Sequence, residues 1–177
     1  MSKLIGIIVS FNRREKLENS IKNCIDNDID HILIIDNHSN DEVISYLKSL
    51  PKEKISVHFN DENKGASAAF KQAVSYLKEI CDLDNDVIVF LDDDAFISKS
   101  FKSQVLKIDM GFIAPCVTDL SGKILKMNRP WVKLPITFWD CFSYLLKRPV
   151  PSNKFNHEPI KAASFVGLTM KARTAYE

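Results

Sequence analysis

Four groups of polar residues follow apolar segments of the chain, and together they could form one ligand site. The groups are Ser10–Arg13, Asp36–Ser39, Asn60–Gly65 and Asp92–Asp94. The last group is the most informative, because three adjacent carboxylates repel one another and are costly to desolvate together. A hard divalent cation, Mg²⁺ or Mn²⁺, would offset that repulsion, and such cations combine a few carboxylates with phosphate oxygens and water.

We expect a division of roles within the acidic triplet. In an extended segment Asp92 and Asp94 point to one side and Asp93 to the other. Asp92 and Asp94 would therefore hold the cation, and Asp93 would support them. A solvated acidic turn is the alternative interpretation. Because the triplet ends a predicted buried strand, its position favours a site for a metal and a diphosphate.

Asp36 ends the second apolar segment, and its carboxylate could accept the imide N–H of a uracil or thymine. An Asx-turn or a helix cap is the alternative for this residue. Ser39, with Glu42 three residues later, has the pattern of a capping box. This pattern predicts that Ser39 caps the helix that follows.

The two remaining groups could contact a nucleotide and its phosphates. The segment Asn63–Gly65 precedes a predicted helix, whose free N–H groups favour an anion, and Lys64 adds positive charge. A helix of small residues packed tightly on the sheet is the alternative there. The segment Phe11–Arg13 could hold a base and ribose, with Arg13 on a phosphate, or it could be an ordinary loop and helix start.

Apolar, β-branched segments alternate with helical patterns in the first part of the chain, which predicts βαβ units. The expected strands are Leu4–Val9, His31–Asp36, Ile55–Asn60, Val87–Leu91 and Gly111–Val117. Their continuous apolar character predicts burial on both faces. We therefore expect an α/β fold, a mainly parallel sheet with helices on both faces, in which ligands bind at the carboxyl ends of the strands.

Amphipathic helices are expected between these strands. Their apolar faces consist of Leu17, Ile21, Cys24 and Ile25, then Val43, Leu47 and Leu50, then Ala66, Phe70, Ala73, Val74, Leu77 and Cys81. After Val117 the pattern changes, and we expect short strands over Lys123–Met127 and Ala162–Met170. An aromatic segment flanked by basic residues, 131–147, lies between them.

Length and composition predict one structural domain. The chain has 177 residues, of which 45% are hydrophobic. Lys and Arg number 24 against 23 Asp and Glu, so we expect no nucleic-acid partner. The four cysteines form no CxxC pair, which predicts reduced thiols in a cytoplasmic protein. The apolar run Leu4–Val9 predicts a buried strand rather than a signal peptide, and no segment has the length of a membrane span.

Four segments together match a known family. They are Ile8–Arg13, Ile35–Asp41, Glu62–Gly65 and Leu91–Asp94. They occur in the order and spacing of family 2 glycosyltransferases, and the sequence most resembles the bacterial rhamnosyl- and galactofuranosyltransferase-like branch. The resemblance covers nearly the whole chain. It implies a GT-A fold and an inverting transfer of a sugar from a UDP- or dTDP-sugar to a glycan or lipid-linked acceptor, in cell-surface polysaccharide synthesis.

The resemblance also implies roles for individual residues. The residues that would bind the nucleotide sugar are Ser10, Phe11, Asn12, Arg13, Asp36, Asn63, Lys64, Gly65, Asp92 and Asp93. Asp92 and Asp94 resemble the two aspartates of the DxD motif, which hold Mn²⁺ or Mg²⁺, and Asp36 resembles the aspartate that reads a pyrimidine. Lys64 is a departure, because many relatives have glycine there, and it leaves the sugar open. Residues 1–117 would form the nucleotide-sugar-binding half.

The second half, 118–177, resembles an incomplete acceptor-side half. Residues 165–173 resemble the strand just upstream of the family's catalytic acidic motif, but no acidic pair follows before Glu177. We therefore expect the base to lie beyond Glu177, in which case this chain is truncated. Within the chain, Asp140 and Glu158 are the only remote candidates. The alternative function is a nucleotide-sugar-binding domain, or an inactive fragment, that lacks the catalytic base.

Two other enzyme or signalling classes are disfavoured by the residues after the first strand. A phospho-receiver domain needs an acidic pair there, and a nucleotidyltransferase needs a glycine-rich basic loop, whereas this chain has Phe11 and Asn12. The aromatic segment 131–147 could lie on anionic lipid at the inner face of the membrane, which would suit a lipid-linked acceptor. Packing on the domain or in a homodimer contact is the favoured alternative.

Overall fold

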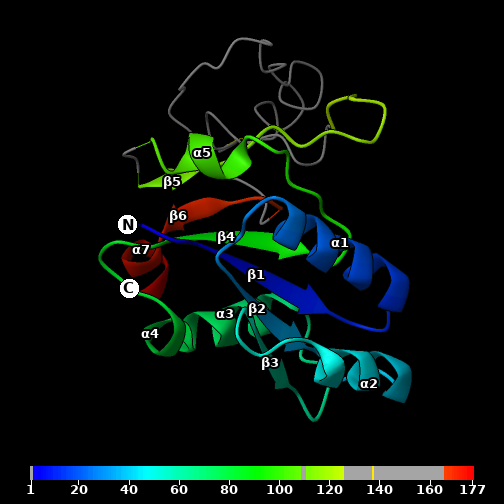
Figure 1. Ribbon diagram of the computed structural model, residues 1–177. Coiled ribbons are helices and arrows are strands. Elements are labelled where there is room, and N and C mark those ends of the chain that lie inside the picture. The colour runs from blue at the N-terminus through cyan, green and yellow to red at the C-terminus, as the bar shows by residue number, and fades with distance from the viewer. Residues whose placement is uncertain (1, 109–110, 126–136, 138–165) are drawn as a thin grey trace.

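The computed structural model describes residues 2–108, 111–125, 137 and 166–177. Within these residues the centre is a six-stranded sheet in the order β3-β2-β1-β4-β6-β5 (Figure 1). The strands are β1 (Leu4–Ser10), β2 (His31–Asp36), β3 (Ile55–Phe59), β4 (Val87–Asp92), β5 (Phe112–Ile113) and β6 (Thr169–Lys171). Strands β1 to β4 pair in parallel, and β6 runs antiparallel to β4 and β5. The predicted α/β fold is confirmed.

Helices cover both faces of this sheet. They are α1 (Arg14–Asp26), α2 (Asp41–Ser49), α3 (Ala66–Ser75), α4 (Leu77–Ile80), α5 (Phe101–Val105) and α7 (Ala172–Tyr176). Alternate residues of each strand point to opposite faces. Ile8 of β1 therefore packs with Leu17 of α1 and Val43 of α2, and Ile7 packs with Phe70 of α3 and Ala172 of α7.

Two helical predictions need correction. A single helix was predicted from Ala66 to Cys81, but α3 ends at Ser75 and α4 begins at Leu77. Between them the N–H of Tyr76 bonds the carbonyl three residues back, which tightens the turn, and the Tyr76 ring stacks on His58 with 3.7 Å between ring centres. Other side chains predicted on the apolar faces lie in solvent, among them Ile25, which is 42% exposed, and Ala66.

The cap of α2 also differs from the prediction. Asn40, not Ser39, is the N-cap, and its side-chain oxygen accepts the backbone N–H of Val43 at 3.1 Å. The Ser39 hydroxyl instead accepts the backbone N–H of Asn12, at 3.0 Å. The predicted capping box is therefore wrong by one residue, because the Ser39 hydroxyl is used to hold the loop after β1.

The strands beyond residue 108 are shorter than predicted. The segment Gly111–Val117 contains only β5, since Pro115 has no backbone N–H to continue a ladder. In place of a strand over Lys123–Met127, the described residues show one isolated bridge, between Thr118 and Ile124. Within Ala162–Met170, β6 begins at Thr169, after a turn at Gly167, whose φ is +74°.

Several predictions fall outside the described residues. These include Asp140, Glu158 and all of the aromatic segment except residue 137.

Cys24, Cys81 and Cys116 are free thiols. Among the helices that the structure describes, none is long and apolar enough to cross a membrane.

Candidate functional site

The carboxyl ends of four neighbouring strands lie along one edge of the sheet. In the strand register, Ser10 stands opposite Asp36, and Asp36 stands opposite Phe59. On the other side of β1, Asp92 stands opposite Val9. The four polar groups that follow these strands therefore share one edge, which we call the carboxyl edge. Topology alone explains this convergence, because the four strands are parallel and adjacent.

Two buried oxygens at the carboxyl edge lack a hydrogen-bond partner among the described residues. Asp36 is fully buried, and one of its oxygens accepts the backbone N–H of Ser39 at 3.0 Å. Its Oδ1 has no partner, and neither does the hydroxyl of the buried Ser10. A buried polar atom without a partner costs about 1–3 kcal/mol. These two oxygens are therefore unsatisfied hydrogen-bond acceptors at the carboxyl edge.

An amide network ties the end of β2 to the loop before α3. The Oδ1 atom of Asn37 accepts from Asn60 Nδ2 at 3.2 Å and from the backbone N–H of Lys64 at 3.1 Å. The Nδ2 atom of Asn37 donates to Asn63 Oδ1 at 2.7 Å, and that oxygen also accepts the backbone N–H of Gly65 at 2.9 Å. Side-chain hydrogen bonds thus hold the predicted segment Asn63–Gly65 against β2.

The acidic triplet forms a turn rather than an extended segment. The N–H of Ala95 bonds the carbonyl of Asp92 at 3.1 Å, and β4 ends at Asp92. The alternation of side chains expected for the triplet is therefore wrong. Asp93 and Asp94 both contact Arg13, whose Nη1 lies 3.0 Å from Asp93 Oδ1 and 3.5 Å from Asp94 Oδ2. Lys16 Nζ lies 2.9 Å from Asp94 Oδ2.

Burial and repulsion between neighbouring carboxylates raise the pKa values of two residues in the acidic turn. Burial raises the pKa of Asp92, and the charges of Asp94 and Asp93 raise it further. Burial also raises the pKa of Asp93, although the guanidinium of Arg13 opposes this. In turn, the carboxylate of Asp93 raises the pKa of Arg13. The carboxylates of the acidic turn therefore carry negative charge that the side chains of Arg13 and Lys16 offset only in part.

The chemistry of the acidic turn fits a hard divalent cation bound together with a phosphate. Asp92 and Asp94 offer carboxylate oxygens, the preferred ligands of Mg²⁺ and Mn²⁺. Among the described residues, no group of three or more His, Cys, Asp or Glu side chains is arranged to hold a metal by itself. A cation here would need ligands from the substrate or water, as Mg²⁺ commonly does.

The loop after β1 is fixed against the start of α2. Asn12 has a left-handed φ of +56°, and its side-chain oxygen accepts the backbone N–H of Asn40 at 2.8 Å. Asn and Asp tolerate this conformation better than most residues. Phe11, which directly follows Ser10, remains 41% exposed, so this loop presents an accessible aromatic ring.

Comparison with protein families gives a match over residues 7–159, to the family described as glycosyl transferase family 2. The chain belongs to glycosyl transferase family 2. It is therefore a transferase domain of the class that uses a nucleotide-sugar donor and an acceptor. The predicted family is confirmed, and the rhamnosyl- and galactofuranosyltransferase-like branch stays a prediction.

Solved structures share the fold of this family 2 domain. A 4-diphosphocytidyl-2C-methyl-D-erythritol synthase aligns with a TM-score of 0.55 and 9% identity, over 98% of this chain and 77% of that one. HddC from Yersinia pseudotuberculosis aligns with a TM-score of 0.50 and 10% identity, over 99% of this chain and 79% of that one. At such identities the likeness shows the fold alone. A search of curated proteins gave no significant match.

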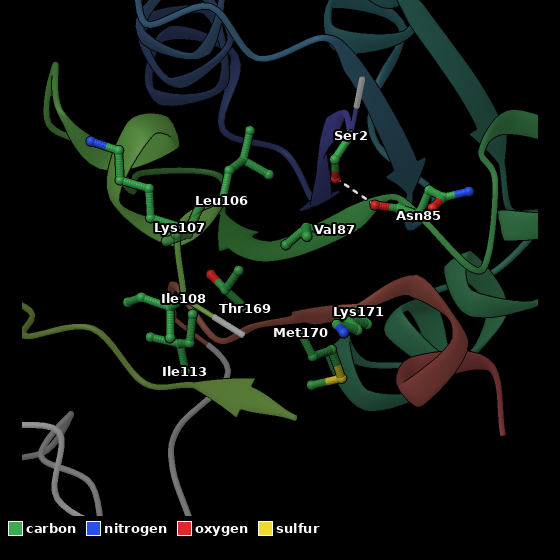
Figure 2. Close-up of a pocket in the computed structure, with 11 residues that line it drawn as sticks. Ser2, Asn85, Val87, Leu106, Lys107, Ile108, Ile113, Thr169, Met170 and Lys171 are labelled. Carbon is green, nitrogen blue, oxygen red and sulfur yellow. Dashed lines mark hydrogen bonds between the residues drawn. The ribbon is translucent and has the colours of Figure 1, made fainter. Parts of the chain in front are cut away.

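Two cavities of the family 2 domain lie away from the carboxyl edge. One, of about 210 Å³, lies between α5 and the β4–β6 pair, with Val87 and Thr169 in its wall (Figure 2). The other, of about 530 Å³, is lined by residues that include Lys78 and Asp86. Val87 begins β4, whereas the acidic turn follows its other end. Neither cavity includes a predicted site residue.

The sequence prediction gave no role to two residues of the candidate site. Asn37 belongs to the predicted polar group Asp36–Ser39, but its side-chain amide forms hydrogen bonds with Asn63 and Lys64, which are distant in the sequence. Lys16 had no predicted role, although it lies three residues after Arg13, the N-cap of α1, and both side chains contact Asp94. That spacing was the available signal for Lys16, and nothing in the local sequence marks Asn37.

Proposed function

We propose that this chain binds a UDP- or dTDP-sugar along the carboxyl edge and transfers its sugar, with inversion, to a glycan or lipid-linked acceptor in cell-surface polysaccharide synthesis. The observation that carries the proposal is the pair of buried oxygens, Asp36 Oδ1 and Ser10 Oγ, without partners among the described residues. A ligand that donates hydrogen bonds would remove the cost of burying them. Family membership supports a nucleotide-sugar donor.

The base of the donor would lie at Asp36. Uracil and thymine carry an imide N–H, which a buried carboxylate oxygen can accept, whereas cytosine has an acceptor at the corresponding ring position. The exposed ring of Phe11 would stack on the base, since aromatic side chains supply a flat apolar surface for stacking. We therefore expect UDP or dTDP to bind more tightly than CDP.

The diphosphate would lie between the start of α3 and the acidic turn. Gly65 caps α3 with no side-chain hydrogen bond, so the first N–H groups of this helix are available to an anion. Asp92 and Asp94 would hold Mg²⁺ or Mn²⁺, and Asp93 would keep Arg13 in place. When bound, such a cation neutralises the charge that develops on a leaving diphosphate.

Binding measured by calorimetry tests this assignment. We would titrate UDP, dTDP, CDP and GDP into the chain with and without Mn²⁺ or Mg²⁺. The variant Asp94→Ala should lose the dependence on the cation, and the control Asp26→Ala, an exposed residue at the far end of α1, should bind as the wild type does. If no pyrimidine diphosphate binds under any condition, the proposed donor site is wrong.

A nucleotide-sugar-binding domain that transfers no sugar is the alternative. It would share the donor site and would differ only in turnover, because transfer needs a base near the acceptor hydroxyl. Release of UDP from a UDP-sugar, with and without glycan acceptors, separates the two functions. Donor binding without acceptor-dependent release would favour the alternative.

A further inference from the structure

Backbone amides fix the orientation of two asparagine side chains at the carboxyl edge. The backbone N–H of Lys64 can only donate, so Asn37 must turn its oxygen toward it. The backbone N–H of Gly65 likewise requires the oxygen of Asn63. The NH₂ group of Asn37 is then left to donate to that same Asn63 oxygen, at 2.7 Å. Position 37 thus needs a side chain that can both accept and donate hydrogen bonds.

Burial makes this requirement strict. Asn37 is 2% exposed and Asn60, which donates to its oxygen, is 8% exposed, so water is poorly placed to replace the bond between these two side chains. The backbone N–H of Asn37 also bonds the carbonyl of Ser10 at 2.8 Å, which fixes the residue beside β1. An aspartate at position 37 would lack the donor, and an alanine would lack both groups.

The network determines where helix α3 begins. Gly65, the N-cap, has a φ of +78°, which favours glycine, and no side chain caps the helix. The side chains of residues 66–68 are exposed, and the first N–H groups of a helix have no acceptor within it. The bonds from Asn37 to Asn63 and Lys64 therefore set the position of these N–H groups relative to Asp36.

We propose that Asn37 is a positioning residue that holds the N-terminus of α3 at the carboxyl edge, where this terminus receives the diphosphate of the donor. The inference rests on the proposed function, which supplies the diphosphate. Asn37 acts through Asn63 and the backbone of Lys64. Substitution of Asn37 should therefore weaken binding of the diphosphate and leave binding of the base unchanged.

Hydrogen exchange on the unliganded chain tests the positioning step without any donor. In Asn37→Asp and Asn37→Ala we expect amide exchange in residues 61–66 to be about tenfold faster, the effect of losing roughly one net hydrogen bond. Exchange in β6 and α7 should accelerate less than in residues 61–66. The control Asn19→Ala, at an exposed position of α1, should leave exchange in residues 61–66 unchanged. Unchanged exchange in residues 61–66 would overturn the inference.

Ligand selectivity tests the diphosphate step. We expect Asn37→Asp to bind UDP about tenfold more weakly, in proportion to the loss of one hydrogen bond, and to bind uridine as the wild type does. An equal loss for UDP and uridine would indicate a general structural role and would overturn the inference. If the wild type binds neither compound, the proposed function fails, and the exchange result still decides whether Asn37 holds the loop.

A double variant tests the pathway through Asn63. If Asn37 acts in part through this residue, Asn37→Ala combined with Asn63→Ala should weaken UDP binding by less than the sum of the two single losses. Additive losses would show that the two residues act separately and would contradict the proposed pathway. Thermal unfolding of each variant, followed by circular dichroism, establishes that the compared chains are folded.

Discussion

The ends of β2 and β4 both carry acidic residues, yet the structure holds them by different means. Asp36 and Asn37 at the end of β2 are buried and are held by hydrogen bonds to backbone and amide groups. At the end of β4, Asp94 is held by Arg13 and Lys16, whose side chains are more than half exposed. Buried hydrogen bonds to amide groups fix one geometry, whereas exposed ion pairs are weak and salt-sensitive.

This difference suggests a division of work along the carboxyl edge. The β2 end is preorganised, because buried and part-buried hydrogen bonds hold its side chains before any ligand binds. The acidic turn after β4 can exchange partners at little cost, since an exposed ion pair contributes only about 0–1 kcal/mol. A rigid β2 end suits selection of a base, and an adaptable acidic turn suits a cation that arrives with the diphosphate.

The largest expected effect is a difference in the free energy of unfolding between a variant at the end of β2 and a variant at the acidic turn. Asn37→Ala removes three hydrogen bonds and leaves the buried Asn60 without its partner, so we expect the free energy of unfolding to fall by about 2–3 kcal/mol. Lys16→Ala removes an exposed ion pair with Asp94 and should cost less than about 1 kcal/mol.

Urea unfolding of both variants measures this difference. Asn19→Ala, exposed on α1, serves as the control and should change the free energy of unfolding by less than about 0.5 kcal/mol. Equal costs for Asn37→Ala and Lys16→Ala would contradict the contrast between a rigid and an adaptable end.

The second effect concerns ligand affinity at the rigid end. Asp36→Asn replaces a buried carboxylate by an amide of the same shape, and we expect affinity for UDP to fall about 10- to 100-fold, because hydrogen bonds to charged groups are worth about 1.5–3 kcal/mol. The free energy of unfolding should not fall, since a neutral amide is easier to bury than a charge.

Calorimetry with UDP, and urea unfolding of the same sample, measure both quantities for Asp36→Asn. Asp61→Asn makes the same chemical change at an exposed position and is the matched control. If Asp36→Asn binds UDP like the wild type, the partnerless oxygen does not face the base. The bond from Ser39 to Asp36 would then be the residue's main role, as in an Asx-turn.

A smaller effect is expected at the adaptable end. Lys16 Nζ neutralises Asp94, so Lys16→Gln should raise the affinity for Mn²⁺ about threefold, in line with the strength of an exposed ion pair. Lys22→Gln removes an exposed charge from the same helix and should have less effect. Mn²⁺ titration followed by electron paramagnetic resonance, at low and high salt, measures both. An unchanged affinity at low salt would mean that Lys16 does not compete with the cation.

The sequence predicts one half of the sheet well and the other half poorly. Strands β1 to β4 match their predicted bounds to within one residue. The predicted burial on both faces holds for β1, β2 and β4, whereas β3, at the edge of the sheet, is mostly half-buried. Strands β5 and β6 are short and pair with each other across more than fifty residues. Their limits depend on Pro115 and on Gly167, where an added Cβ would meet Pro115 Cγ at 2.5 Å.

The candidate site divides in the same way. The residue types at the strand ends, and their shared edge, follow from the sequence because parallel topology places them there. The sequence could not show that Asp93 and Asp94 both turn toward Arg13, because that depends on the local turn after β4. Nor could it show the bond from Asn37 to Lys64, since side-chain contacts between distant segments have no local signature.

The smallest expected effect is a pH dependence that arises in the acidic turn. Burial, followed by the charges of Asp94 and Asp93, raises the pKa of Asp92 above its ordinary value of 3.8. A raised pKa means that the folded state binds the proton more tightly than the unfolded state does. Ionisation of Asp92 therefore lowers the stability of the fold as pH rises through the window from 3.8 to the raised value, and the loss persists above it.

Asp92→Asn should remove this loss. We expect its free energy of unfolding at neutral pH to exceed that of the wild type by no more than about 1 kcal/mol, because the site is partly solvated, and the difference should shrink as pH falls below 3.8. Asp84 provides a control of opposite sign, since hydrogen bonding to Arg173 lowers its pKa and its ionised form stabilises the fold at neutral pH. Urea unfolding of Asp92→Asn and Asp84→Asn across acidic and neutral pH should therefore give differences of opposite sign. Two differences of the same sign would mean that the acidic turn carries no excess negative charge, and the contrast with the β2 end would lose its electrostatic basis.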